Sequence, residues 1–145
     1  MDSELDITLD TEPAAGDLDI LRRGYDADTE AAIGEEGRRE IACFLRDQAG
    51  NVLGGVKGIY SNYGWLWVDL LWISEPYRGQ GYGTKLMNQI EGEAAKNGCR
   101  NAYLNSFSFQ AVEFYRKLGY RVFGQLEDFP RGHQVCSMTK SIGAP

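Results

Sequence analysis

The chain of 145 residues is long enough for one compact domain with a hydrophobic core and too short for two, so we expect a single domain spanning residues 1–145. Its 43% hydrophobic and 25% charged residues exclude global disorder and are typical of a soluble protein. The net charge is −6, but residues 1–40 carry 13 acids against 4 bases, which disfavours nucleic acid and favours a cationic partner, or simply gives a solvated surface.

The first predicted elements are a short strand and a helical region. Residues 7–9 are typical of an opening strand, and Asp17 is a candidate N-cap for one or two helices. The apolar positions that follow are Leu18, Leu21, Tyr25 and Ala32. Because residues 1–19 are acidic throughout, we expect no secretory signal.

Three strands in close succession are predicted next, over residues 40–46, 52–60 and 65–73. Turn residues at 47–51 and 61–64 supply positive φ angles and local hydrogen bonds, so an antiparallel meander follows. The third run contains Asp69 and is too short to span a bilayer, and we expect no membrane partner.

The rest of the chain alternates helices and strands. The apolar stripe of a first helix consists of Leu86, Met87, Ile90, Ala94 and Ala95. A second helix begins at the N-cap Ser108, ends near Gly119 and has the apolar positions Ala111, Phe114, Tyr115 and Leu118. Strands are expected over residues 101–105, 120–126 and 134–139. The order predicts an α/β domain with one mixed sheet flanked by helices.

The three cysteines are widely spaced and form no CxxC pair; they are Cys43, Cys99 and Cys136. This pattern is typical of buried or half-buried thiols in a reducing cytoplasm and disfavours a disulfide framework or a zinc site. We therefore expect a cytoplasmic protein without a metal ion.

The most informative segment is Arg78-Gly79-Gln80-Gly81-Tyr82-Gly83-Thr84, between an apolar strand and an amphipathic helix. Its glycines let the backbone bend and an anion approach, and the N–H groups and dipole of the helix start favour a pyrophosphate. The segment lacks the Gly-Lys-Ser/Thr of a P-loop and the glycine spacing of a dinucleotide fold. A glycine-rich turn without a ligand is the alternative.

The same segment resembles the GNAT superfamily of acyl-CoA N-acyltransferases, because residues 78–83 match its [RQ]-x-x-G-x-[GA] signature. Residues 111–120, Ala-Val-Glu-Phe-Tyr-Arg-Lys-Leu-Gly-Tyr, are similar to the family's later helix A-xx-FY-xKLGF/Y. The element order and length fit as well. The resemblance implies the GNAT fold, with a mostly antiparallel sheet splayed near the cofactor, and dimers are common in the family.

The resemblance also implies the reaction, in which acetyl-CoA donates an acetyl group to a primary amine of a small molecule or peptide by direct attack in a ternary complex. The cofactor contacts that it implies are Leu71, Trp72, Ile73, Arg78, Gly79, Gln80, Gly81, Tyr82, Gly83 and Thr84. Ser108 stands where the family often has Asn, and a hydroxyl can replace that amide contact only in part.

Tyr115 is the first-choice general acid, because it matches the tyrosine that the family places near the thioester sulfur; alternatively it is simply core. Asp69 is the candidate base or amine-orienting anion, since a carboxylate in so apolar a strand needs a partner or a task. His133 is a second candidate base, unless it is an exposed and inert loop residue. The aromatic candidates for the walls of an acceptor pocket, which equally suit a core, are Trp65, Trp67 and Phe107.

Two other functions stay open at this stage. A CoA-binding domain could sense or regulate without turnover, against which the intact Tyr115 argues. The other function is that of an acyltransferase toxin acting on aminoacyl-tRNA. Such a toxin usually has a basic surface, so the acidic residues 1–40 count against it.

Overall fold

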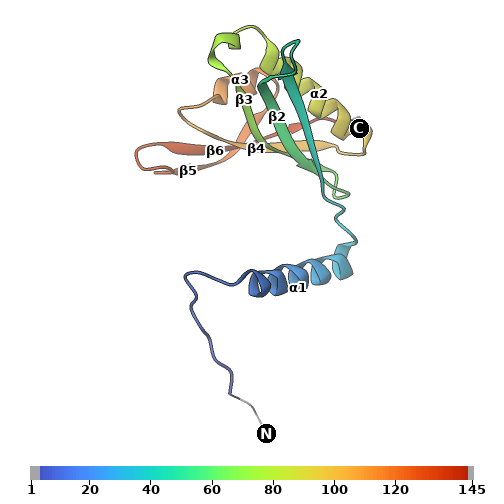
Figure 1. Ribbon diagram of the computed structural model, residues 1–145, viewed down its shortest axis with the longest axis vertical. Helices are drawn as coiled ribbons and strands as arrows, with labels where there is room; N and C mark the ends of the chain where they lie inside the picture. The colour runs from blue at the N-terminus through green and yellow to red at the C-terminus, as the bar shows by residue number, and fades with distance from the viewer. Residues whose placement is uncertain (1–3, 144–145) are drawn as a thin grey trace. The chain divides into compact units, whose positions relative to one another are not determined.

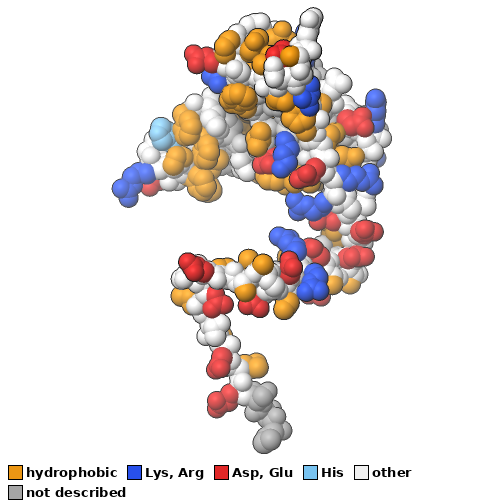
Figure 2. All heavy atoms as spheres, in the orientation of Figure 1, with side chains coloured by type: hydrophobic (Ala, Val, Ile, Leu, Met, Phe, Trp, Pro, Cys, Tyr) orange, Lys and Arg blue, Asp and Glu red, His pale blue; other side chains and the backbone are white. Residues whose placement is uncertain are grey.

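The computed structural model describes residues 4–143 of the chain. The chain divides into two compact units at Glu35 and Glu36. The first contains one helix, α1 (Ala15–Ile33), preceded by residues without regular structure. None of the residues of α1 is buried, and Figure 2 shows acidic side chains along this unit.

The N-terminal unit corrects two expectations. Residues 7–9 form no strand, and the side chains of Ile7 and Leu9 are exposed. A strand needs a second backbone for its N–H and C=O groups, and none of the six described strands pairs with this segment. The helix begins at Ala15 after the N-cap Ala14, so Asp17 lies in the first turn instead of capping it.

The second unit is a six-stranded mixed sheet in the order β1-β2-β3-β4-β6-β5 with two helices (Figure 1). Its strands are β1 (Arg39–Arg46), β2 (Val52–Tyr60), β3 (Trp65–Ile73), β4 (Asn101–Phe107), β5 (Arg121–Glu127) and β6 (Gln134–Ser141). A 3-10 turn (Glu75–Tyr77) leads into α2 (Tyr82–Lys96), and α3 (Val112–Lys117) follows β4. Among the six described strands only β3 and β4 pair in parallel, so the predicted mixed, mostly antiparallel sheet is confirmed.

The core lies between α2 and one face of the sheet. The predicted stripe is buried at Leu86, Met87, Ile90 and Ala94. Buried sheet residues of the same cluster include Val56, Leu66, Val68, Leu104 and Met138. Because side chains alternate along a strand, the neighbours of Leu66 and Val68, namely Trp65 and Trp67, point to the opposite face.

Two irregularities of β3 shape the region at its C-terminal end. The parallel register with β4 runs only from Trp65 to Trp67, after which the two strands separate. In the register with β2, Gly58 lies opposite Val68 and Lys57 opposite Leu70, so Asp69 is the extra residue of a β-bulge. Bulges re-aim side chains, and this one turns a carboxylate toward the place where β3 leaves β4.

Ser108 does not cap a helix. The N-cap of α3 is Ala111, and the Ser108 hydroxyl accepts a hydrogen bond from the Gln134 N–H at 3.1 Å. The Ser108 N–H in turn donates to the Gln134 carbonyl at 2.8 Å. The backbone bond continues the pattern of β4 against β6, and β4 itself ends at Phe107, two residues beyond the predicted end.

Among residues 4–143, no helix is long and apolar enough to cross a membrane. The same residues hold no group of three or more His, Cys, Asp and Glu side chains suited to a metal ion. The free thiols are Cys43, which is half-buried, and Cys99 and Cys136, which are buried.

Candidate active site

The glycine-rich segment forms the turn that starts α2, as predicted. Gly79 and Gly81 have φ angles of +72° and +85°, which other residues adopt only with strain. Gly81 is the N-cap of α2, and a Cβ placed there would meet no atom within 4 Å. The helix start is therefore open, and its N–H groups lie beside a space that suits an anion.

A cavity of about 440 Å³ lies at this turn. Nine of the ten residues predicted for the cofactor in β3 and the turn line it, all but Gln80. The side-chain amide of Gln80 instead donates to the Pro76 carbonyl at 3.1 Å, which braces the turn from outside. The Phe114 ring lies against Gly83, where a Cβ would come within 3.1 Å of it, so this glycine permits close packing of α3 on α2.

Arg78 links the turn to the end of β3. Its Nε donates to the Ile73 carbonyl at 2.7 Å, which fixes the guanidinium at the border of the cavity. Together with the dipole of α2, this cation gives the cavity a positive potential that suits phosphate groups.

A second cavity, of about 600 Å³, occupies the gap where β3 and β4 separate. Its lining includes Asp69, Phe107 and Tyr115, the first-choice general acid. It shares Leu71, Trp72, Ile73, Arg78 and Ala111 with the cavity at the glycine turn. The two cavities thus adjoin along β3, one at the glycine turn and the other at Tyr115 and Asp69.

Tyr115 is only 8% exposed and is held by aromatic neighbours. Its ring meets Phe114 and Tyr120 edge to face, with centroids 5.2 Å and 5.8 Å away. Burial raises the pKa of the Tyr115 hydroxyl above its ordinary value, so the phenol keeps its proton at neutral pH. A protonated hydroxyl at the border of the cavity can act as a proton donor.

Asp69 has the partner that its apolar surroundings predicted. The Lys57 ammonium lies 3.5 Å from Oδ2 of Asp69 and 3.6 Å from a carboxylate oxygen of Glu40. Lys57 therefore bridges two acids at the bulge, and its charge offsets that of Asp69.

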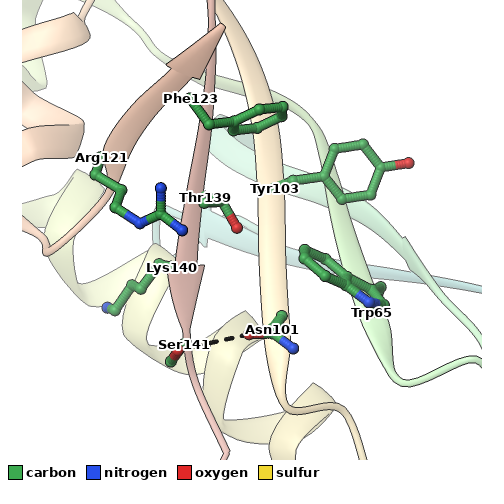
Figure 3. Close-up of a pocket in the computed structure, with 8 residues that line it drawn as sticks. All are labelled: Trp65, Asn101, Tyr103, Arg121, Phe123, Thr139, Lys140 and Ser141. Carbon is green, nitrogen blue, oxygen red and sulfur yellow. Dashed lines mark hydrogen bonds between the residues drawn. The ribbon is translucent and has the colours of Figure 1, made fainter.

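The predicted aromatic residues divide between sites. Trp65 and Trp67 line a cavity of about 250 Å³ together with Tyr103, apart from the one that contains Asp69. Trp65 and Tyr103 also border the depression drawn in Figure 3, across β3, β4, β6 and β5. Only Phe107 of the three joins Tyr115, and it stacks on Phe109 with centroids 5.3 Å apart.

His133 and Ser108 lie outside the linings of the two cavities along β3. The His133 ring is exposed and meets Phe109 edge to face at 4.9 Å. Two residues that the sequence analysis did not select, Asn105 and Gln110, do line the cavity beside Tyr115. The alternation of Asn105 with buried neighbours was a usable signal, but only the separation of β3 from β4 opens a cavity beside it.

Comparison with known proteins gives consistent matches. The model of the acetyltransferase (GNAT) family matches residues 9–120. An acetyltransferase of Agrobacterium fabrum (strain C58) is 34% identical over 110 residues, which are 76% of this chain and 80% of that protein. The blasticidin-S acetyltransferase of Streptomyces morookaense is 35% identical over 102 residues, or 70% and 74% of the two chains. A crystal structure of an acetyltransferase from Bacillus cereus matches with a TM-score of 0.83 and 33% identity, covering 92% of this chain and 97% of that one.

Proposed function

Because the chain belongs to the acetyltransferase (GNAT) family, we propose that it transfers an acetyl group from acetyl-CoA to the primary amine of a small molecule. The observation that carries the proposal is that the two cavities adjoin along β3, where they share five lining residues. One lies at an open, positively charged helix start, and the other contains a buried phenol and a carboxylate.

The residues present fit coenzyme A. The helix start after Gly81 and the guanidinium of Arg78 suit its pyrophosphate, and Thr84 adds a hydroxyl. The exposed edge of β3 over residues 71–73 would hold the pantetheine arm, because β4 has diverged and leaves that edge free for a ligand. This arrangement would bring the thioester into the cavity of Tyr115.

The reaction then needs a neutral amine, donors for the oxyanion and a proton for the thiolate. The nitrogen lone pair attacks the thioester carbon in a ternary complex, the carbon–sulfur bond breaks, and the amine loses a proton. Backbone N–H groups of β3 beyond Trp67 are the candidate donors to the oxyanion, because the β4 pairing ends there. The Tyr115 hydroxyl would protonate the departing sulfur.

Asp69 would bind the acceptor as an ammonium and receive its proton, directly or through water. Its place in the cavity of Tyr115 supports this assignment. The ion pair with Lys57 means that an incoming cation competes with a resident one. A small-molecule acceptor is supported by the blasticidin-S acetyltransferase, at 35% identity.

The test is an acetylation assay with acetyl-CoA and a panel of amines, including diamines, polyamines, aminoacyl nucleosides and short peptides. Released thiol would be measured against a no-amine control, and the acetylated product would be identified by mass spectrometry. We expect thiol release that depends on a small amine and is lost in Gly81→Asp. Tight binding of acetyl-CoA with no turnover across the panel would support a regulatory binding domain instead.

A further inference from the structure

A buried carboxylate behind the site has no part in the mechanism above. Glu91, in the third turn of α2, is 7% exposed. One of its oxygens accepts a hydrogen bond from the Tyr120 hydroxyl at 2.9 Å, and the other lies 2.6 Å from the Lys140 ammonium. Burying a carboxylate costs much free energy unless it is paired and hydrogen-bonded, and here both oxygens are satisfied.

Tyr120 connects this carboxylate to the proposed acid. It is 2% exposed, its N–H donates to the Tyr115 carbonyl at 3.0 Å, and its ring meets the Tyr115 ring edge to face at 5.8 Å. The Lys140 ammonium also lies over the Tyr120 ring, 5.5 Å from its centroid. Glu91 and Lys140 thus fix the orientation of Tyr120, which contacts both the backbone and the ring of Tyr115.

The same carboxylate belongs to the helix that starts at the glycine turn. A helix is stiff over this length, so Glu91 is rigidly connected to Gly81, whereas Tyr120 follows the end of α3 and Lys140 is part of β6. The network therefore joins α2, which starts at the glycine turn, to α3, which carries Tyr115. The helix α3 itself has only six residues and one buried side chain, Tyr115, and the Phe114 ring also packs against Gly83 of α2.

Resting on the proposed function, we infer that Glu91, Tyr120 and Lys140 are positioning residues, which hold the Tyr115 hydroxyl at a fixed place relative to coenzyme A bound at the α2 start. Lys140 has a second effect. Its ammonium offsets the negative charge of Glu91, so the Tyr115 phenol has no uncompensated carboxylate behind it. A displacement of about 1 Å in a catalytic group is enough to lower a rate by about a hundredfold.

The test is a double-mutant cycle of Tyr120→Phe with Tyr115→Phe, measuring kcat, the KM for acetyl-CoA and the melting temperature. Tyr120→Phe keeps the ring and removes only the hydroxyl that binds Glu91. We expect kcat to fall about tenfold with the KM for acetyl-CoA little changed. In the Tyr115→Phe background the same substitution should leave kcat unaltered, because the phenol that it positions is gone.

Two further variants separate positioning from general stability. Glu91→Gln should reproduce the loss of kcat. Thr139→Val removes a part-buried hydrogen bond from the Thr139 hydroxyl to the Ala102 carbonyl, in the same strand as Lys140 but outside the network, and should lower only the melting temperature.

The outcomes are distinguishable. A Tyr120→Phe variant that melts earlier but turns over like the parent, while Tyr115→Phe is slow, would overturn the positioning role and leave the proposed function intact. If Tyr115→Phe itself turned over at the parental rate, the acid assigned to the reaction would be wrong, and the inference would fall with it.

Discussion

The Lys57 ammonium lies 3.5 Å from a carboxylate oxygen of Asp69, across the register shift between β2 and β3. Both side chains are partly exposed, at 41% and 29%, so the pair is in contact with solvent at the cavity border. Lys57 also lies 3.6 Å from Glu40, which gives its ammonium a second carboxylate to bind. A cationic acceptor at Asp69 can therefore displace Lys57 without leaving that ammonium unpaired.

Replacing Lys57 tests this competition. Lys57→Met should lower the KM for a cationic acceptor by about two- to fivefold, because exposed ion pairs of this kind have modest strength. The effect should shrink as salt is added, since screening weakens both attractions. Lys96→Met removes an equal charge from the last turn of α2 and serves as the matched control. A KM that rises in Lys57→Met would show that Lys57 helps to bind the acceptor.

Asp69→Asn distinguishes the two tasks proposed for the carboxylate. If Asp69 accepts the proton, kcat should fall by about 10²- to 10⁴-fold. If it only anchors the ammonium, the acceptor KM should rise while kcat persists. Steady-state rates with a cationic acceptor, taken at several acceptor concentrations, measure both constants. Parental values of both constants would remove Asp69 from the site.

The glycine turn can be tested with a pair of substitutions that share one shape. Gly81→Asp and Gly81→Asn place similar side chains at φ +85°, with a comparable strain of roughly 1–2 kcal/mol. Only the aspartate adds a charge where the pyrophosphate should lie. Calorimetric titration with coenzyme A should therefore show much weaker binding for Gly81→Asp than for Gly81→Asn. Equal affinities would mean that the anion binds elsewhere.

The glycine turn at the start of α2 and the layout of the sheet were predictable because their signals are local. Glycines 79, 81 and 83 stand immediately before an apolar stripe, and the strands have turn residues between them. The boundaries of β2 and β3 agree with the prediction to the residue, since one face of each strand must be buried. Residues 7–9 have an equally suitable local pattern, but a strand also requires a partner, which no local pattern supplies.

Contacts between residues far apart in the chain are the ones that local patterns miss. Glu91 of α2 and Lys140 of β6 are 49 residues apart, and only the tertiary fold brings their side chains together. The bulge at Asp69 likewise depends on the pairing of β3 with β2, not on the composition of either strand. The residue type of Ser108 predicts a helix cap, whereas its hydroxyl accepts a hydrogen bond from the Gln134 N–H of β6.

Tyr115→Phe should lower kcat by about ten- to a thousandfold and leave the affinity for acetyl-CoA nearly unchanged. The ring keeps its edge-to-face contacts with Phe114 and Tyr120, so the melting temperature should barely move. Rapid-mixing measurements of the first turnover would show whether chemistry limits the rate. An unchanged first-turnover rate would assign Tyr115 to the core alone.

The Tyr120 phenol should make the protein sensitive to alkali. Burial, followed by the neighbouring Glu91 carboxylate, raises the pKa of Tyr120 well above its ordinary value of 10.0. The folded protein thus retains a proton that the unfolded chain loses above about pH 10. The stability linked to this proton is fully present below pH 10 and is lost as the pH rises further, by up to about 1.4 kcal/mol per pH unit.

Tyr120→Phe removes the phenol and with it this dependence. The variant should be less stable than the parent at pH 8, because Glu91 loses a hydrogen bond. Its free energy of unfolding should then decline less steeply between pH 10 and 11.5, so the two curves converge. Urea denaturation across this range measures the slopes, and Tyr25→Phe, which alters a ring that is 66% exposed, is the control whose curve should parallel that of the parent. Parallel curves for Tyr120→Phe and the parent would mean that the Tyr120 proton is not held more tightly in the folded protein, and that its hydroxyl does not depend on the Glu91 carboxylate as the 2.9 Å contact indicates.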